Sequence, residues 1–265
     1  MLKKTLNILS WCALFAAVIF LLGFSSSKQK KKICSKVLIQ IDKSDENHFV
    51  SVEDVFAMIA DEVDTISGKS LISIDTEKIE YQLENHPSIA NAEVYKTIDG
   101  TLMVEIEQRR PIVRIFPRNG DSFYMDNEGN MMPVSENFTA RVMVANGFIK
   151  ESYFKNYHLN AREIYQNDSL SKTSLLDDIF LFADYVQKHP FWEAQIEQLY
   201  VNKESEIELI PRVGNHTIVF GDASNLDEKF NNLMIFYNQG LEKTGWNEYS
   251  SINLKFKDQI ICTKI

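Results

Sequence analysis

The clearest alternation of hydrophobic and polar residues lies in residues 86–116, on both sides of Asp99-Gly100. The apolar side chains share one face in each run: Ala92, Val94 and Ile98 in the first, and Leu102, Val104 and Ile106 in the second. Two such runs around Asp-Gly predict a β-hairpin, because glycine accepts the positive φ of a type I′ turn. Pro111 cannot donate to a central ladder, so we expect one domain to end near Arg110.

A strand and two helices are predicted before this hairpin. Residues 37–41 form a short apolar run typical of a strand. Ser51, followed by Asp54, is close to a capping box, in which a hydroxyl and a carboxylate satisfy free amides at a helix start. Residues 71–74 are expected to be a brief extended link, and Asp75 can cap a second helix that ends before Pro87. The order β-α-α-β-β therefore occupies residues 37–110.

Beyond Pro111 the pattern is dominated by short strands, with two long helices between them. Strands are expected at residues 114–116, 123–125, 131–134, 141–145, 196–202, 206–211, 216–221, 249–257 and 260–264. Ser174 begins a predicted helix that ends at His189-Pro190, and a second helix is expected from Asp222 to Lys243. Residues 150–172 are weakly patterned and indicate a surface loop. These elements predict an α+β protein.

The N-terminal segment predicts a membrane helix. Leu6–Phe24 contains no charge, and at about 1.5 Å per residue its helix approaches the thickness of a hydrocarbon core. This divides the N-terminus into a tail at residues 1–5, a span at 6–24 and a basic linker at 25–36. The alternative is a cleaved signal peptide, with Ser25 and Ser27 at the cleavage site, but the apolar run is longer than is usual for one.

The lysines around this segment leave its orientation open. Two lie before it, at Lys3 and Lys4, and five lie in the linker: Lys28, Lys30, Lys31, Lys32 and Lys36. The positive-inside rule alone places the large domain in the cytoplasm, although the rule weakens for long translocated segments. The other interpretation is a juxtamembrane strip that meets lipid headgroups on the outer face.

Charge and cysteine content narrow the class of protein. After residue 36 the chain carries 21 basic and 37 acidic side chains, and such a field repels phosphate backbones, so nucleic acid is not an expected partner. Three cysteines are present, and Cys34 and Cys262 can pair only if the two ends of the chain meet. The sequence leaves that pairing open.

The sequence contains no recognisable catalytic or metal-binding pattern. Its five histidines are scattered, and motifs such as HExxH, GxSxG and the P-loop are absent. Asp126, Glu128 and Asn130 alternate as calcium ligands can, but Gly129 is wrongly placed for an EF-hand, which favours a hairpin turn. We therefore expect no catalytic residue, metal, cofactor or small-molecule substrate, which disfavours an anchored envelope hydrolase.

Two places have the residues of a binding or structural site. Arg109-Arg110, before Pro111, is interpreted as a bracket at a domain junction, because guanidinium groups bind carbonyls and carboxylates. The second place is residues 250–265, short strands that leave free amides and carbonyls for a partner strand if they end a sheet. The alternative interpretation is an edge strand whose lysines prevent pairing with another strand.

Several motifs, taken together in their order and spacing, resemble those of the FtsQ/DivIB cell-division family, in the form typical of Bacteroidetes. The motifs begin at residues 86–111, HPSIANAEVYKTIDGTLMVEIEQRRP, and 123–144, FYMDNEGNMMPVSENFTARVMV. They continue at residues 209–241, LIPRVGNHTIVFGDASNLDEKFNNLMIFYNQGL, and 249–261, YSSINLKFKDQII. The resemblance implies a POTRA domain at 37–110 and a mixed, mainly antiparallel β domain with flanking helices at 111–265.

The resemblance also implies function. It implies a single-pass inner-membrane protein with its bulk in the periplasm, which acts as a non-enzymatic divisome scaffold and helps control septal peptidoglycan synthesis. FtsB-like and FtsL-like proteins are the implied partners. A partner strand is implied to bind at five positions: Tyr249, Ser251, Ile252, Leu254 and Phe256. The alternative is a POTRA-containing envelope assembly or secretion module, which the missing series of amphipathic barrel strands disfavours.

Overall fold

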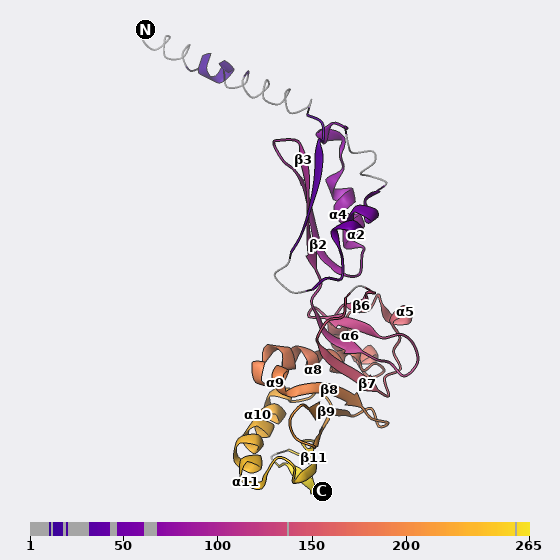
Figure 1. Ribbon diagram of the computed structural model, residues 1–265, viewed down its shortest axis with the longest axis vertical. Helices are drawn as coiled ribbons and strands as arrows, with labels where there is room; N and C mark the ends of the chain where they lie inside the picture. Colours follow the sequence, from indigo (N-terminus) through magenta and orange to yellow (C-terminus); the bar gives the residue numbers. More distant parts are fainter. Residues whose placement is uncertain are drawn as a thin grey trace. The chain divides into compact units, whose positions relative to one another are not determined.

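A computed structural model describes residues 11, 13–17, 20, 32–42, 47–60, 68–136, 138–257 and 259–265 of the 265-residue chain (Figure 1). The chain forms two compact units. Unit 1 comprises Met1–Ser44 and Val50–Gln108, and unit 2 comprises Asp45–Phe49 and Arg109–Ile265. No helix among the described residues is both long enough and apolar enough to cross a membrane. The predicted span, residues 6–24, lies mostly outside the described residues, as do the predicted tail at 1–5 and most of the predicted linker.

Unit 1 has the predicted β-α-α-β-β order. Its elements are β1 (Lys36–Ile41), α2 (Val52–Met58), the short 3-10 helix η1 (Leu71–Ser73), α4 (Thr76–Glu84), β2 (Ile89–Lys96) and β3 (Thr101–Gln108). The strands pair in the order β1-β3-β2, with β1 parallel and β2 antiparallel to β3. Figure 1 shows α2 and α4 on one side of this sheet, where Val55, Ile79 and Leu83 are buried.

The two helix starts follow the predicted capping chemistry. Ser51 Oγ accepts a bond from the Asp54 amide at 3.1 Å, and Asp54 Oδ2 accepts one from the Ser51 amide at 2.9 Å. The pKa of Asp54 is lowered because the Ser51 amide and hydroxyl both donate to its carboxylate. Asp75 likewise accepts a bond from the Lys78 amide at the start of α4. The capping box therefore satisfies free amides as the sequence predicts.

Three details of unit 1 differ from the prediction. Residues 97–100 form a four-residue connection between β2 and β3, in which the Thr97 amide donates a hydrogen bond to the Thr101 carbonyl. The predicted two-residue type I′ turn is therefore wrong. A type I′ turn needs positive φ at both central residues. Gly100 has φ +101°, but Asp99 is not among the described non-glycine residues with positive φ. Ile98 is 82% exposed because it lies in this connection, and residues 71–73 are 3-10 helix rather than extended.

Unit 2 is built on one mixed sheet with the order β12-β11-β10-β9-β8-β7-β4-β5-β6. Its strands are β4 (Pro111–Ile115), β5 (Phe123–Asp126), β6 (Met131–Pro133), β7 (Met143–Gly147), β8 (Ile196–Val201), β9 (Ile207–Pro211), β10 (Thr217–Gly221), β11 (Tyr249–Asn253) and β12 (Ile261–Lys264). Parallel pairs are β4 with β7, β7 with β8 and β10 with β11, and the other neighbouring pairs are antiparallel. The sheet is therefore mixed and mainly antiparallel.

Helices pack against this sheet around an aromatic core. The helices are α5 (Tyr153–Asn156), α6 (Ala161–Gln166), α7 (Asp168–Ser171), α8 (Leu176–Lys188), α9 (Pro190–Gln195), α10 (Leu226–Phe236), the π-helix η2 (Tyr237–Leu241) and α11 (Glu242–Thr244). Phe182 of α8 and Phe230 of α10 meet Phe220 of β10, with ring centroids 4.7 Å and 4.8 Å away. Pairs of this kind stabilise a core beyond the area that they bury.

Two predicted stretches of unit 2 are corrected. Residues 150–172 contain α5, α6 and α7 rather than a loop, because Asn160 and Asn167 cap α6 and α7 with their side-chain oxygens. The predicted helix at 222–243 begins four residues later, at Leu226. Asp222 instead accepts hydrogen bonds from the Ser224 amide and from Lys229 Nζ, and these bonds hold the residues before α10 in a turn.

Candidate partner-binding edge of the sheet

The C-terminal edge of the unit 2 sheet is β12, while β11 lies one position inside it. β11 pairs with β10 on one side and with β12 on the other, so its backbone has partners on both sides. β12 has a described strand on one side only. The predicted segment 250–265 thus ends the sheet, but the strand whose backbone is open to a partner is Ile261–Lys264.

The direction of the β12 amides follows from a single hydrogen bond. The Ile265 amide donates to the Glu248 carbonyl at 3.2 Å, so it points toward the β11 side. Successive amides of a strand point to opposite sides, and those of Ile261 and Thr263 therefore also point inward. The amides of Cys262 and Lys264 point outward, toward the open edge.

The two faces of this edge differ in character. Cys262 pairs with Ile252, which is fully buried, so Cys262 lies on the core face. Ile261 and Thr263 lie on the opposite face, where Ile261 is 45% exposed. On the core side, Phe236 at the end of α10 lies with its ring centroid 5.9 Å from that of Tyr249. A strand added to β12 would extend both faces, and its core-facing side chains would best be apolar.

The structure separates the five predicted partner-binding residues into three environments. Tyr249, Ser251 and Ile252 lie in β11, where Ile252 is buried. Leu254 is 3% exposed and its amide donates to the Val219 carbonyl, so it belongs to the core. Phe256 is 46% exposed. Ile252 and Leu254 are thus both buried in the core, whereas Phe256 is not.

A side-chain turn explains why the predicted strand at 249–257 ends early. Asn253 Oδ1 accepts a hydrogen bond from the Lys255 amide at 3.0 Å. This Asx-turn redirects the backbone after Asn253. Phe256 then lines a recess of about 420 Å³, together with Lys255, Glu206 and Lys229. Lys255 forms an ion pair with Glu206 at 2.7 Å, and Lys229 forms one with Asp222 at 3.0 Å.

A buried polar pair supports β10 beneath this edge. His216, which precedes β10, is 2% exposed, and its Nε2 lies 2.9 Å from the Tyr237 hydroxyl. Burial lowers the pKa of His216 and raises that of Tyr237, so both are neutral near pH 7. The Trp246 ring lies 5.0 Å from that of Tyr237. This cluster fixes β10, which in turn positions β11.

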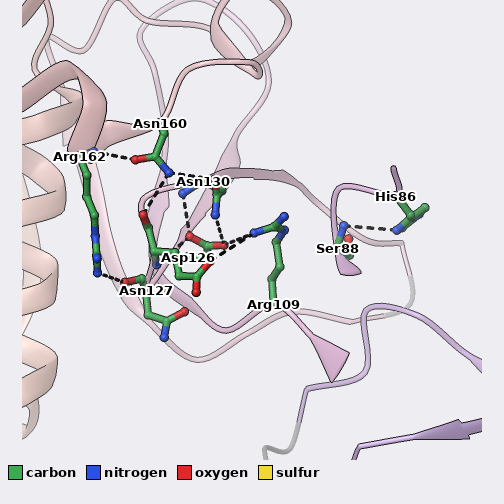
Figure 2. Close-up of polar contacts among 9 residues, drawn as sticks. His86, Ser88, Arg109, Asp126, Asn127, Asn130, Asn160 and Arg162 are labelled. Carbon is green, nitrogen blue, oxygen red and sulfur yellow. Dashed lines mark hydrogen bonds and ion pairs between the residues drawn. The ribbon is translucent and has the colours of Figure 1, made fainter. Parts of the chain in front are cut away.

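The predicted junction residues join a second polar network, within unit 2 (Figure 2). Arg109 Nη1 lies 2.9 Å from Asp126 Oδ2, and the Asp126 side chain is 1% exposed. Asp126 Oδ1 also accepts bonds from the amides of Glu128 and Asn130. The Arg110 carbonyl accepts a bond from the Asn127 amide, and Pro111 pairs with Asp126. Arg109 thus binds a carboxylate as predicted, and residues 126–130 form the predicted hairpin turn.

Helix α6 completes this network, which the sequence did not reveal. Asn160 Nδ2 donates to Asn130 Oδ1 at 2.8 Å, and Arg162 Nη2 donates to the Asn127 carbonyl at 2.9 Å. Figure 2 shows Asp126 between Arg109 and Asn130, with Asn160 on the far side of Asn130. The alternating Asp126, Glu128 and Asn130 therefore organise a turn. Within the described part of the chain, no three histidine, cysteine or acidic side chains are grouped so that they could hold a metal ion.

The described cysteines lie in different units. Cys34 of unit 1 is buried, Cys262 of unit 2 is half-buried, and both are free thiols. Burial raises the pKa of Cys262. The thiol is therefore protonated near pH 7, which disfavours a nucleophilic role because the thiolate is the reactive form.

Comparison with known proteins gives matches over both units. The family model described as "FtsQ/DivIB, C-terminal related" matches residues 110–263, and the model described as a POTRA-like domain matches residues 32–107. A relative from Geotalea daltonii, described as cell division protein FtsQ, is 20% identical over 265 residues. That alignment covers all of this chain and 88% of the relative.

Proposed function

This chain belongs to the FtsQ/DivIB C-terminal related family, which supports a role in cell division, and we propose that it is a non-enzymatic scaffold of the division machinery. The observation that carries the proposal is the open edge of β12, with the outward amides of Cys262 and Lys264. Scaffolds that bind by β-augmentation need such an edge, because main-chain hydrogen bonds supply affinity without any catalytic group. Through its partners, the scaffold would help to control septal peptidoglycan synthesis.

The proposed partner is an FtsB-like protein that adds a strand beside β12, with an FtsL-like protein in the same assembly. The fit is supported by the free backbone of β12 and by Phe236 and Tyr249 on its core side. Tyr249, Ser251 and Ile252 support the edge from β11. Phe256, which lines the recess and is half exposed, would contact the partner beyond its strand.

Two substitutions of one residue test this edge. Lys264→Pro removes an outward amide, whereas Lys264→Ala keeps the amide and removes only the side chain. With the full chain in nanodiscs and the FtsB-like protein from the same organism, Lys264→Pro should weaken binding at least tenfold, and Lys264→Ala by less than about threefold. Equal binding by Lys264→Pro and the unchanged chain, with the same circular dichroism, would remove the edge from the proposal.

We further propose the domain organisation and location. Residues 1–5 would be a cytoplasmic tail, 6–24 an inner-membrane anchor, 25–36 a basic linker, 37–110 the POTRA domain and 111–265 the periplasmic β domain. Arg109, Arg110 and Pro111 would form the domain junction. A cysteine-accessibility assay tests the topology in a variant whose three native cysteines are replaced by serine. A membrane-impermeant thiol reagent should label an introduced cysteine at exposed Thr263 in intact spheroplasts and leave one at residue 2 unlabelled.

The POTRA-like match at residues 32–107 also suits an envelope assembly or secretion module. An N-terminal fluorescent fusion at native level separates the two functions. A midcell band that appears with constriction supports the division scaffold. An even envelope signal, with normal septa after depletion of the protein, supports the assembly module instead.

A further inference from the structure

One end of unit 1 combines exposed isoleucines with lysines. Ile33, Ile72 and Ile98 are 56%, 58% and 82% exposed. They come from three segments: the residues before β1, helix η1, and the connection between β2 and β3. Single exposed apolar residues are ordinary, but three from separate segments at one end form a surface that requires an explanation.

Backbone contacts hold these segments together. Ile33 forms a β-bridge with Ser70, and the Leu71 amide donates to the Lys32 carbonyl, which joins the first segment to η1. The Ser35 amide donates to the Gly100 carbonyl, and Lys32 Nζ donates to the Ile98 carbonyl, which joins the first segment to the β2–β3 connection. The three isoleucines therefore belong to one ordered surface, here called the isoleucine end.

The same end is basic. Lys36 and Lys69 are exposed, while Lys32 and Lys96 donate to backbone carbonyls, which carry no charge to neutralise them. Two carboxylates, Asp75 and Asp99, lie nearby. The described residues of this end are thus net positive, within a chain whose net charge is -9.

The chain's own connection brings this end to a membrane. In the proposed organisation the span ends at Phe24, and residues 25–31 lead directly to Lys32. Even fully extended, this connection reaches only about 30 Å. Aliphatic side chains that enter the interface, surrounded by lysines that meet headgroup phosphates, are the chemistry of proteins that lie on an anionic bilayer.

We propose that the isoleucine end of unit 1 docks on the surface of the bilayer that anchors the chain, with anionic lipid headgroups as its ligand. Ile33, Ile72 and Ile98 enter the interface, and Lys36 and Lys69 contact phosphate groups. This inference rests on the membrane anchor of the proposed function but does not depend on the partner strand at β12.

A photocrosslinker tests the contact directly in the full chain. p-Benzoylphenylalanine is placed at Ile98 or, as the control, at Val52. Val52 is also exposed, but it lies near the other end of β3, since the amide of neighbouring Val50 bonds to Gln108. In nanodiscs containing phosphatidylglycerol, mass spectrometry should find roughly tenfold more lipid adduct at position 98 than at position 52.

A second part of the experiment varies the lipid composition of the nanodisc and the charge of the isoleucine end. The Lys36→Gln/Lys69→Gln variant should lower the adduct at position 98 in phosphatidylglycerol nanodiscs and leave it unchanged in phosphatidylcholine nanodiscs. Equal or absent lipid adducts at positions 98 and 52 would overturn the proposal, as would a protein adduct at position 98 in cells in place of a lipid adduct.

Alkaline extraction of cell membranes distinguishes failure of the anchor from failure of the docking. A chain that resists extraction but forms no lipid adduct at position 98 is anchored without docking, which refutes this inference alone. A chain that is extracted but still forms the adduct binds as a peripheral protein, which supports the docking and refutes the anchor. A chain that is extracted and forms no adduct refutes both.

Discussion

His216 Nε2 lies 2.9 Å from the Tyr237 hydroxyl, and this bond joins the residue before β10 to the first residue of the π-helix η2. A π-helical turn is uncommon and often occurs where a helix accommodates a specific side chain. Here it lies beside the strand that positions β11. The packing beneath β10, two strands from the open edge, thus includes one buried neutral histidine.

Acidification should destabilise unit 2 through His216. Burial lowers the pKa of His216, so the unfolded chain binds a proton at a higher pH than the folded chain. The stability that His216 contributes is therefore present above its unfolded pKa of about 6.5 and is lost as the pH falls through the folded pKa. In urea unfolding followed by tryptophan fluorescence, the stability of the unchanged chain relative to that of His216→Gln should fall between pH 7 and pH 5. His216→Gln should be less stable at pH 7 and show a smaller dependence on pH, and an identical slope would contradict the role of His216.

Asp178 should act in the opposite direction. Burial, together with Asp177 and Asp222, raises the pKa of Asp178 to about 6. Its stabilising contribution is present below the unfolded pKa of about 4 and is lost as the pH rises through 6. Asp178→Asn should therefore stabilise the protein at pH 7.5 by roughly 1–2 kcal/mol, and the gain should vanish near pH 4. Asp121→Asn, an exposed control, should have little effect at either pH.

The Asp126 network should be costly to remove. Asp126→Ala loses the Arg109 ion pair and the bonds from Glu128 and Asn130, so we expect a loss of about 3–5 kcal/mol in the free energy of unfolding. Glu128→Ala is the matched control, because Glu128 lies 4.0 Å from Arg109 and its side chain is 66% exposed. Its expected effect is below about 0.5 kcal/mol. Urea midpoints by tryptophan fluorescence suit both variants, since Trp192 and Trp246 lie in unit 2. If Asp126→Ala and Glu128→Ala lowered the free energy of unfolding by similar amounts, the buried ion pair would contribute no more than an exposed one.

The capping box of α2 should contribute modestly to unit 1. Ser51→Ala removes the hydroxyl that accepts a hydrogen bond from the Asp54 amide. Loss of an N-cap of this kind lowers the free energy of unfolding by about 1 kcal/mol. Hydrogen exchange should show faster exchange of the α2 amides at residues 53–55, with no change at α8. Ser51→Asp keeps an N-cap acceptor and should retain most of the protection. Unchanged exchange in Ser51→Ala would contradict the capping role.

Gly147 should tolerate no side chain. Its φ is +104°, and an added Cβ would lie 2.2 Å from the Val201 carbonyl oxygen, where β7 pairs with β8. Gly147→Ala should therefore reduce the yield of folded protein or lower the thermal midpoint sharply. Gly68→Ala is the control, because Gly68 also has positive φ but has open space around it. Comparable effects of the two substitutions would indicate that backbone conformation, rather than the collision, decides the loss.

Local chemistry made much of unit 1 predictable from the sequence. The capping box at Ser51 and Asp54 depends on residues three apart, and the faces of the hairpin depend on period-two alternation. Ile98 was misplaced because alternation cannot show where a strand ends and its connection begins. The caps of α6 and α7, at Asn160 and Asn167, were readable as N-cap residues but lay in a stretch with weak hydrophobic periodicity.

Non-local pairing explains what the sequence could not show of the candidate site. The chain order does not indicate that β7 lies between β4 and β8, or that β11 pairs with β10 in parallel after the α10 crossover. The sequence predicts a strand at 249–257, whereas the Asn253 side chain ends it at Asn253. That the open edge of the sheet is β12, rather than β11, depends on these long-range contacts.

The strand order of unit 2 also has a mechanical consequence. After the short segment Asp45–Phe49, the chain returns to unit 2 at Arg109, beside β4, and six strand spacings separate β4 from β12. At about 4.8 Å each, these spacings amount to roughly 30 Å of continuously hydrogen-bonded sheet. Tension between the entry point and a partner on β12 would pull across this sheet, while tension along the partner strand would load its bonds in shear. The sheet of unit 2 therefore sets a fixed separation between the entry to β4 and the open edge of β12.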